Sequence, residues 1–185
     1  MTTASTLDAD QLSELLHELG RRLTARGVEG ALYVVGGAAI ALAHDARRVT
    51  IDLDCVASPR DEVLAEAREV ALLHGLPDEW LNSRAAAWIP TLPPHWTTSG
   101  VDYSGLRIHL ADARTLVAMK LISDRTRDFA DLVTLFPAAG ITRPEDALAL
   151  VHDAYPDGAG TRIPADGDIL VDAAAVLVAV EATRQ

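Results

Sequence analysis

Two carboxylates separated by one residue, Asp52 and Asp54, are the side chains of this sequence best suited to bind a metal ion. The segment Val49–Val56 around them alternates apolar and polar residues, which predicts a β-strand. Residues two apart in a strand project from the same face, with side chains roughly 7 Å apart at the base. Two such acids repel one another unless a cation lies between them, and Mg²⁺ prefers oxygen ligands. The pair predicts a magnesium site, although two solvated acids on an edge strand fit the same pattern.

A glycine pair, Gly36-Gly37, separates a predicted buried strand, Ala31–Val35, from a predicted short helix, Ala38–His44. Glycine lets a phosphate approach the backbone closely, and the free N–H groups at a helix start attract anions. A plain strand-to-helix turn would use the same residues. With a metal-binding acid pair on the next strand, however, the glycines predict a site for a nucleoside triphosphate, where a bridging metal ion neutralises charge during in-line attack.

The chain has a single lysine, Lys120, among 16 basic residues. It is followed by Asp124, Asp128 and Asp131, which on one straight helix would form a stripe of charges. By composition alone, this stripe predicts a solvated helix face stabilised by pairs four residues apart. Asp124 and Asp128 are accordingly interpreted as salt-bridge or capping residues.

Four stretches of the sequence resemble, in the same order, the nucleotidyltransferase superfamily with the polymerase-β fold. They are VGGAA (35–39), RVTIDLD (48–54), LPDEWLNSRAAAWIP (76–90) and LVAMKLISDRTRDFADL (116–132). Within that superfamily they resemble the AbiEii-like, MenT-type toxins and their small relatives. The resemblance covers about residues 31–136 and implies an α/β (α+β) fold, a small mixed sheet of nucleotidyltransferase type flanked by helices.

The resemblance implies an activity and a metal. Gly36 and Gly37 would hold the nucleotide phosphates, and Asp52 and Asp54 would bind Mg²⁺. The implied reaction is magnesium-dependent transfer of a nucleotide from a nucleoside triphosphate to an acceptor hydroxyl. The toxin subgroup further implies a tRNA 3′ end as the acceptor and a cognate antitoxin protein as a partner.

The resemblance also assigns roles to residues outside the two pairs. Lys120 would contact the triphosphate, as a point charge suited to departing pyrophosphate. Asp131 would belong to the helical motif that completes the catalytic site. Arg48 and Thr50 flank the metal strand and would touch the nucleotide.

Two features depart from the pattern of the superfamily. Ala38 follows the glycine pair where serine is frequent, so one hydroxyl contact to phosphate is absent. Many members place a third carboxylate on a later strand, but the candidate strand Leu106–Leu110 offers His109, and Asp112 better fits a helix cap. These departures leave open a catalytically degenerate nucleotidyltransferase-fold domain that binds a partner.

A second enzyme class shares part of the pattern. Residues Asp52–Val56 fit the D-x-D-x-[TV] motif of haloacid-dehalogenase-like phosphatases, and Gly167–Asp172 spells their G-D-x-x-x-D. In that chemistry Asp52 would attack phosphorus and Asp54 would be the acid/base. The second motif needs a buried strand directly before it, whereas Asp168–Val180 has the period of a helix.

Hydrophobic periodicity predicts the elements that must position these residues. The predicted helices are Thr6–Arg26, capped by Thr6 or Asp8, then Ala38–His44, Pro59–His74, Asp112–Asp124, Asp128–Phe136 as its continuation or as a second helix, Pro144–Ala154 and Asp166–Arg184.

The strand Val49–Val56 is expected to turn Ile51, Leu53 and Cys55 inward. The stretch 75–100 is predicted to be loop-rich, with a short helix near Asp78–Leu81 and tryptophans that pack it onto the core. The predicted organisation is a nucleotidyltransferase core over 1–112 and a helical region over 113–185 packed on it.

The composition predicts a cytoplasmic globular protein. The 185 residues contain 49% hydrophobic side chains and a single cysteine, no apolar run is long enough for a membrane span, and the N-terminus does not resemble a signal peptide.

The net charge of −11 argues against a surface that binds nucleic acid throughout. A local groove for RNA would need a cluster of arginines. The candidates are Arg47, Arg48, Arg84, Arg125 and Arg127.

Overall fold

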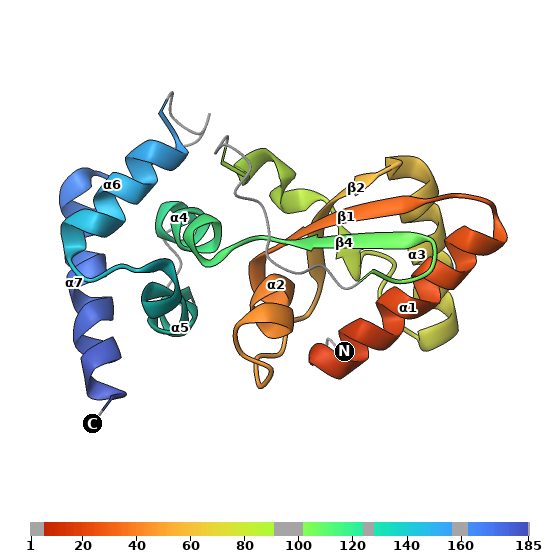
Figure 1. Ribbon diagram of the computed structural model, residues 1–185, viewed down its shortest axis with the longest axis horizontal. Helices are drawn as coiled ribbons and strands as arrows, with labels where there is room; N and C mark the ends of the chain where they lie inside the picture. Colours follow the sequence, from red (N-terminus) through yellow and green to blue (C-terminus); the bar gives the residue numbers. More distant parts are fainter. Residues whose placement is uncertain (1–5, 91–101, 124–127, 157–162, 185) are drawn as a thin grey trace. The chain divides into compact units, whose positions relative to one another are not determined.

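The computed structural model describes residues 6–90, 102–123, 128–156 and 163–184. Within these residues, four strands form one mixed sheet (Figure 1). The strands are β1 (Gly30–Val35), β2 (Leu53–Ser58), β3 (Leu81–Asn82) and β4 (Leu106–Leu110), in the order β3-β2-β1-β4. β2 is antiparallel to β1, whereas β3 is parallel to β2 and β4 is parallel to β1. The predicted class, a small mixed sheet with flanking helices, is confirmed.

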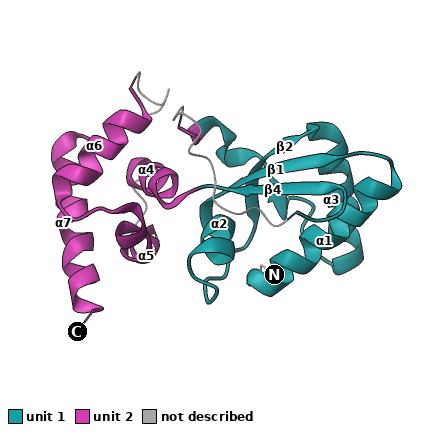
Figure 2. Cartoon of the chain, viewed as in Figure 1, with its two compact units in different colours: residues 1–87, 96–111 teal, residues 88–95, 112–185 magenta. Residues whose placement is uncertain are grey.

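The chain divides into two compact units (Figure 2). Unit 1 comprises residues 1–87 and 96–111 and contains the sheet, and unit 2 comprises residues 88–95 and 112–185. The predicted packing of the helical region on the core stays a prediction.

Two helices of unit 1, α1 (Ala9–Ala25) and α3 (Arg60–His74), pack against one another and contact β4 and β2, respectively. As predicted, Asp8 caps α1, and its Oδ1 accepts the Gln11 N–H at 2.9 Å while Gln11 Oε1 accepts the Asp8 N–H at 3.0 Å. The leucines of α1 recur at helical spacing and are buried, which explains why this segment is an amphipathic helix. They are Leu12, Leu15, Leu16, Leu19 and Leu23.

The sheet buries one face. On β2, Leu53 and Cys55 are fully buried, Asp54 is half-buried, and Val56 is 42% exposed. Successive side chains of a strand point to opposite faces, so this alternation sets Asp54 on the face opposite the core. The predicted inward orientation of Leu53 and Cys55 is confirmed.

The second strand begins at Leu53 rather than at the predicted Val49. Thr50 instead pairs with Leu7 in an isolated bridge, where the Leu7 N–H donates to Thr50 O at 2.6 Å and the Thr50 N–H donates to Leu7 O at 2.9 Å. Because this bridge holds the chain beside the N-terminal segment, Ile51 lies outside the sheet and is 53% exposed. The prediction that Ile51 faces the core is wrong.

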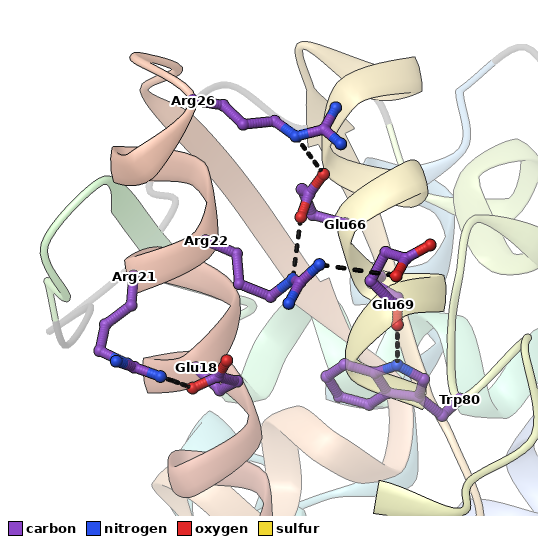
Figure 3. Close-up of polar contacts among 8 residues, drawn as sticks. Glu18, Arg21, Arg22, Arg26, Glu66, Glu69 and Trp80 are labelled. Carbon is purple, nitrogen blue, oxygen red and sulfur yellow. Dashed lines mark hydrogen bonds and ion pairs between the residues drawn. The ribbon is translucent and has the colours of Figure 1, made fainter. Parts of the chain in front are cut away.

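A turn, closed by the Trp80 N–H donating to Pro77 O, and the start of β3 at Leu81 replace the helix predicted near Asp78–Leu81. The Leu53 N–H donates to Trp80 O at 2.6 Å, so this segment is drawn into the sheet beside β2. The 3₁₀ helix η1 (Arg84–Trp88) follows. Trp80 is buried, and its indole Nε1–H donates to Ala67 O at 2.8 Å (Figure 3). Trp80 therefore packs the segment onto α3, as predicted.

An ion cluster links α1 to α3 (Figure 3). Glu66 is 2% exposed, and its Oε2 and Oε1 lie 2.9 Å from Arg22 Nε and 2.7 Å from Arg26 Nε, respectively. Arg22 also lies 3.6 Å from Glu69. Burial of Glu66 was not predicted, because helical periodicity distinguishes apolar from polar residues and does not identify a polar residue that has partners on another helix.

Unit 2 is built from helices that pack in pairs. They are α4 (Ala113–Ser123), α5 (Phe129–Ala139), α6 (Pro144–Ala154) and α7 (Asp166–Ala182). α4 contacts α5 and α6, and α7 contacts the same two helices. The predicted bounds of α6 are confirmed, and α7 ends two residues before the predicted Arg184. None of the described helices is both long and apolar enough to cross a bilayer.

Gly167–Asp172 lies within α7, as its periodicity predicts. The described residues directly before this helix, 163–165, are not a strand. The G-D-x-x-x-D pattern therefore lacks the preceding strand that the phosphatase motif requires.

Candidate functional site

Asp52 and Asp54 lie at one corner of the sheet, where β2 begins. Asp52 directly precedes β2, and Asp54 pairs in register with Val35, the last residue of β1. Asn82 is the in-register neighbour of Asp54 on β3, and its Nδ2 donates to Asp52 Oδ2 at 3.2 Å. Both carboxylates are half-buried and belong to this corner, next to the residue at which the glycine pair begins.

Gly36 turns the chain from β1 into α2 (Gly36–Ala43) in a left-handed conformation, with φ of +67°. A Cβ added there would lie 3.5 Å from Asp54 Oδ2, so this turn borders the carboxylate. The N-cap, Val35, makes no side-chain hydrogen bond to the helix, and the first turn contains no acidic residue. The N–H groups of this first turn are therefore suited to an anionic oxygen.

Gly37 lies against Thr50. A Cβ added to Gly37 would lie 2.9 Å from Thr50 Oγ1 and 3.7 Å from an Arg48 guanidinium nitrogen. Thr50 is buried, and its hydroxyl donates to Asp52 O at 3.0 Å, while Arg48 donates to Val49 O. The structure thus brings the predicted residues of unit 1 together around one turn. In this conformation the Thr50 hydroxyl supports the backbone at Asp52.

The later strand β4 carries no acid, and the residue next to Asp54 on the neighbouring strand β3 is an amide. His109 lies on β4, in register with Tyr33 on the side of β1 away from β2. The direct neighbour of Asp54 is Asn82, which is 8% exposed. In the sequence, Asn82 belongs to the W-L-N segment of the resemblance. Its position beside Asp54 is not evident there, because the pattern predicts a helix that ends at Leu81.

The donor set of this corner fits a hard divalent cation. Two carboxylates supply oxygen ligands, and Mg²⁺ is commonly bound by one or two carboxylates with waters and substrate phosphates as its other ligands. Among the described residues, no group of three or more His, Cys, Asp or Glu side chains is arranged to hold a metal ion. Asp52 and Asp54 would therefore hold such an ion together with other oxygens, such as those of water and of substrate phosphates.

Lys120 and Asp131 are brought together within unit 2. Lys120 Nζ donates to Asp131 Oδ2 at 2.7 Å and to Asp128 Oδ1 at 2.8 Å. Ser123 Oγ donates to the other oxygen of Asp128 at 2.7 Å. The charged side chains are only 5–12% exposed, so the predicted solvated stripe on one straight helix is wrong. Lys120 extends from α4 and meets acids at the start of α5, and Asp124 lies outside the described residues.

The arginines expected to line a nucleic-acid groove are partly neutralised by nearby acids. Arg47 pairs with Asp45 at 3.2 Å, and Arg84 pairs with Glu79. Arg125 and Arg127, like the other residues of 124–127, lie outside the described part of the chain.

A model of the protein family described as "Nucleotidyltransferase of unknown function (DUF6036)" matches residues 8–135. The match spans more than half of the 185 residues, and the chain belongs to this family. The matched region includes Asp52, Asp54, Lys120 and Asp131. The predicted nucleotidyltransferase superfamily is confirmed. No curated protein and no solved structure was found to match the sequence.

Proposed function

We propose that this protein transfers a nucleotide from a nucleoside triphosphate to an acceptor hydroxyl, with the triphosphate held at the corner formed by Asp52, Asp54 and Gly36. The observation that carries the proposal is the convergence of two carboxylates and a left-handed glycine at the start of α2. A metal ion that binds phosphates needs carboxylate oxygens as further ligands. The phosphate oxygens themselves are suited to backbone N–H donors.

Asp52 and Asp54 would hold Mg²⁺ at this corner. When bound, the ion would neutralise and polarise the phosphates. The N–H groups of the first turn of α2 would receive phosphate oxygens, and Gly36 keeps this approach free of a side chain. The acceptor hydroxyl would lose its proton to solvent as its oxygen forms a bond to the α-phosphorus, while the bond from that phosphorus to the β-phosphate oxygen breaks and pyrophosphate leaves.

The proposed acceptor is the 3′ end of a tRNA, and the proposed partner is an antitoxin protein. Both come from the resemblance of the four sequence stretches to MenT-type toxins. The net charge of −11 requires that an RNA contact be confined to a local surface. The proposed location is the cytoplasm.

The resemblance also brings Lys120 and Asp131 into the proposal, as the triphosphate contact and as part of the catalytic motif. Within unit 2, Lys120 already donates to two carboxylates. A phosphate would therefore have to compete with Asp128 and Asp131 for the ammonium group.

This competition supports a second candidate function, a nucleotidyltransferase-fold module that binds a partner without catalysis. Lys120 then stabilises unit 2 only, and β4 carries His109 where many superfamily members place a third carboxylate.

The two candidates differ in whether label from a nucleotide is incorporated. Purified protein is incubated with Mg²⁺, total RNA and each nucleoside triphosphate labelled at the α-phosphate. Transferase activity predicts labelled RNA, with loss of at least about 100-fold in Asp52→Asn, the size expected when a major electrostatic contribution to a transition state is removed. The matched control, Asp78→Asn, changes an exposed acid of the same unit and should retain wild-type activity. No incorporation with any of the four nucleotides favours the binding module.

A further inference from the structure

Asn82 is the only asparagine of the chain, and both its side-chain nitrogen and its side-chain oxygen form hydrogen bonds. Its Oδ1 accepts the Arg84 N–H at 2.9 Å. Its Nδ2 donates to Asp52 Oδ2 at 3.2 Å and to Glu79 O at 3.3 Å. An asparagine amide has two N–H donors, and both are used here.

These bonds determine which end of the amide faces the acid pair. If the amide were flipped, its oxygen would face two acceptors, Asp52 Oδ2 and Glu79 O, and its NH₂ would face the Arg84 N–H donor. Both changes replace a hydrogen bond by repulsion. Asn82 therefore presents a donor to Asp52, and its own oxygen accepts the Arg84 N–H.

We propose that Asn82 is a positioning residue that holds the Asp52 carboxylate for divalent-cation binding. This inference rests on the proposed function. The Asn82 amide takes one oxygen of Asp52, Oδ2, which fixes the rotation of the carboxylate and leaves Oδ1 free of this amide. Carboxylate ligands are generally oriented by such outer hydrogen bonds.

The short strand β3 is what makes this positioning rigid. Asn82 is buried and lies in register with Asp54, so backbone pairing sets its Cα beside the acid pair. Trp80 anchors the same segment to α3 through Ala67 O. The donor therefore belongs to the sheet rather than to a loose loop, and little ordering is needed when a cation binds.

The side-chain NH₂ groups of the protein offer a direct test, because the chain contains only Asn82, Gln11 and Gln185 as amide side chains. In ¹⁵N-labelled wild-type protein, the Asn82 NH₂ pair is identified by its absence in Asn82→Ala. We expect Mg²⁺ to shift the Asn82 pair and to leave the two glutamine pairs in place. Backbone amides of Asp52 and Asp54 are followed in the same titration.

Each outcome of this titration has one meaning. Shifts at Asp52, Asp54 and the Asn82 pair support the inference. Shifts at the two aspartates with an unchanged Asn82 pair overturn the inference and leave the proposed metal site intact. No shift at either aspartate contradicts the metal site of the proposed function itself.

Metal affinity supplies the second arm. Mn²⁺ binding, measured by the electron paramagnetic resonance signal of the free ion, should weaken about 10- to 100-fold in Asn82→Ala, the range typical of lost outer hydrogen bonds. The control Glu79→Gln alters an exposed side chain but keeps the carbonyl that accepts from Nδ2 and should bind Mn²⁺ as wild type does. A purely structural role would lower the melting temperature of Asn82→Ala without changing the Mn²⁺ affinity of its folded form, and that result would refute the positioning role. If Asn82→Ala does not fold, the Gln11→Glu and Gln185→Glu variants assign the two glutamine pairs and so identify the Asn82 pair by elimination, which keeps the titration decisive.

Discussion

Gly36 and Gly37 are both needed as glycines, for different physical reasons. At Gly36 the reason is backbone conformation, because a φ of +67° costs an L-residue about 1 to 2 kcal/mol. At Gly37 the reason is packing, because an added Cβ would lie 2.9 Å from Thr50 Oγ1. A glycine pair read from sequence alone suggests phosphate binding, yet each glycine also has a structural cause that is independent of any ligand.

The packing at Gly37 predicts a coupled pair of substitutions. Gly37→Ala should destabilise the protein by about 1 to 3 kcal/mol, as overpacking does. Adding Thr50→Ala removes the hydroxyl that the new methyl meets, so the double variant should lose less stability than the sum of the single variants. Urea unfolding followed by circular dichroism measures the three values. Strict additivity would show that the two side chains do not interact.

The single cysteine, Cys55, reports on the integrity of the sheet. Burial, with a smaller contribution from Asp54, raises the pKa of the Cys55 thiol to about 12. We expect no reaction of Cys55 with Ellman's reagent in the native protein at pH 8, and full reaction in denaturant. Because the native thiol keeps its proton while the unfolded thiol loses it near pH 9, stability should fall as the pH rises from about 9 to 12. Rapid native labelling at pH 8 would contradict this account.

At the scale of elements, the sequence predicts those that local signals determine. α1 has a capping residue and leucines at helical spacing, and α6 begins with a proline. The predicted start of β2 was wrong because the bridge between Leu7 and Thr50 joins segments that are distant in sequence. The same reason explains why the sequence revealed neither the bond of Asn82 to Asp52 nor the partners of Glu66, since each depends on another element.

The ion cluster between α1 and α3 predicts a large difference between two neighbouring acids. Glu66→Ala should cost about 3 kcal/mol, because it removes the buried carboxylate that pairs with both Arg22 and Arg26 and leaves Arg22 only the more distant Glu69. The matched control is Glu69→Ala on the same helix, where the side chain is 53% exposed and the change should stay below about 1 kcal/mol. Equal losses of stability in Glu66→Ala and Glu69→Ala, measured by thermal unfolding, would contradict the structural role of Glu66.

The link between α4 and α5 predicts that Lys120 contributes to stability as well as to any chemistry. Lys120→Met removes the ammonium group that pairs with Asp128 and Asp131 and should destabilise unit 2 by about 3 to 5 kcal/mol. A second substitution, Asp131→Asn, should restore part of that loss. Arg114→Met, at an exposed position of α4, is the control. A free energy of unfolding in Lys120→Met equal to that of the wild type would contradict the structural role of Lys120 and would favour a role in phosphate binding.

At the scale of the whole molecule, membership of a nucleotidyltransferase family agrees with the mixed sheet and with an acid pair at its corner. The family description does not state a substrate, so the acceptor and the partner remain proposals. The strongly acidic chain also means that a negatively charged triphosphate needs a cation to approach two carboxylates.

That requirement makes metal placement the most direct test of the central claim. Crystals of the full chain grown with Mn²⁺ and a non-hydrolysable nucleoside triphosphate would locate the ion by its anomalous scattering. The account predicts a Mn²⁺ peak bound by Asp52, Asp54 and phosphate oxygens, with the phosphates at the first turn of α2. Well-ordered nucleotide and Mn²⁺ at another surface, with both carboxylates free of the ion, would contradict it.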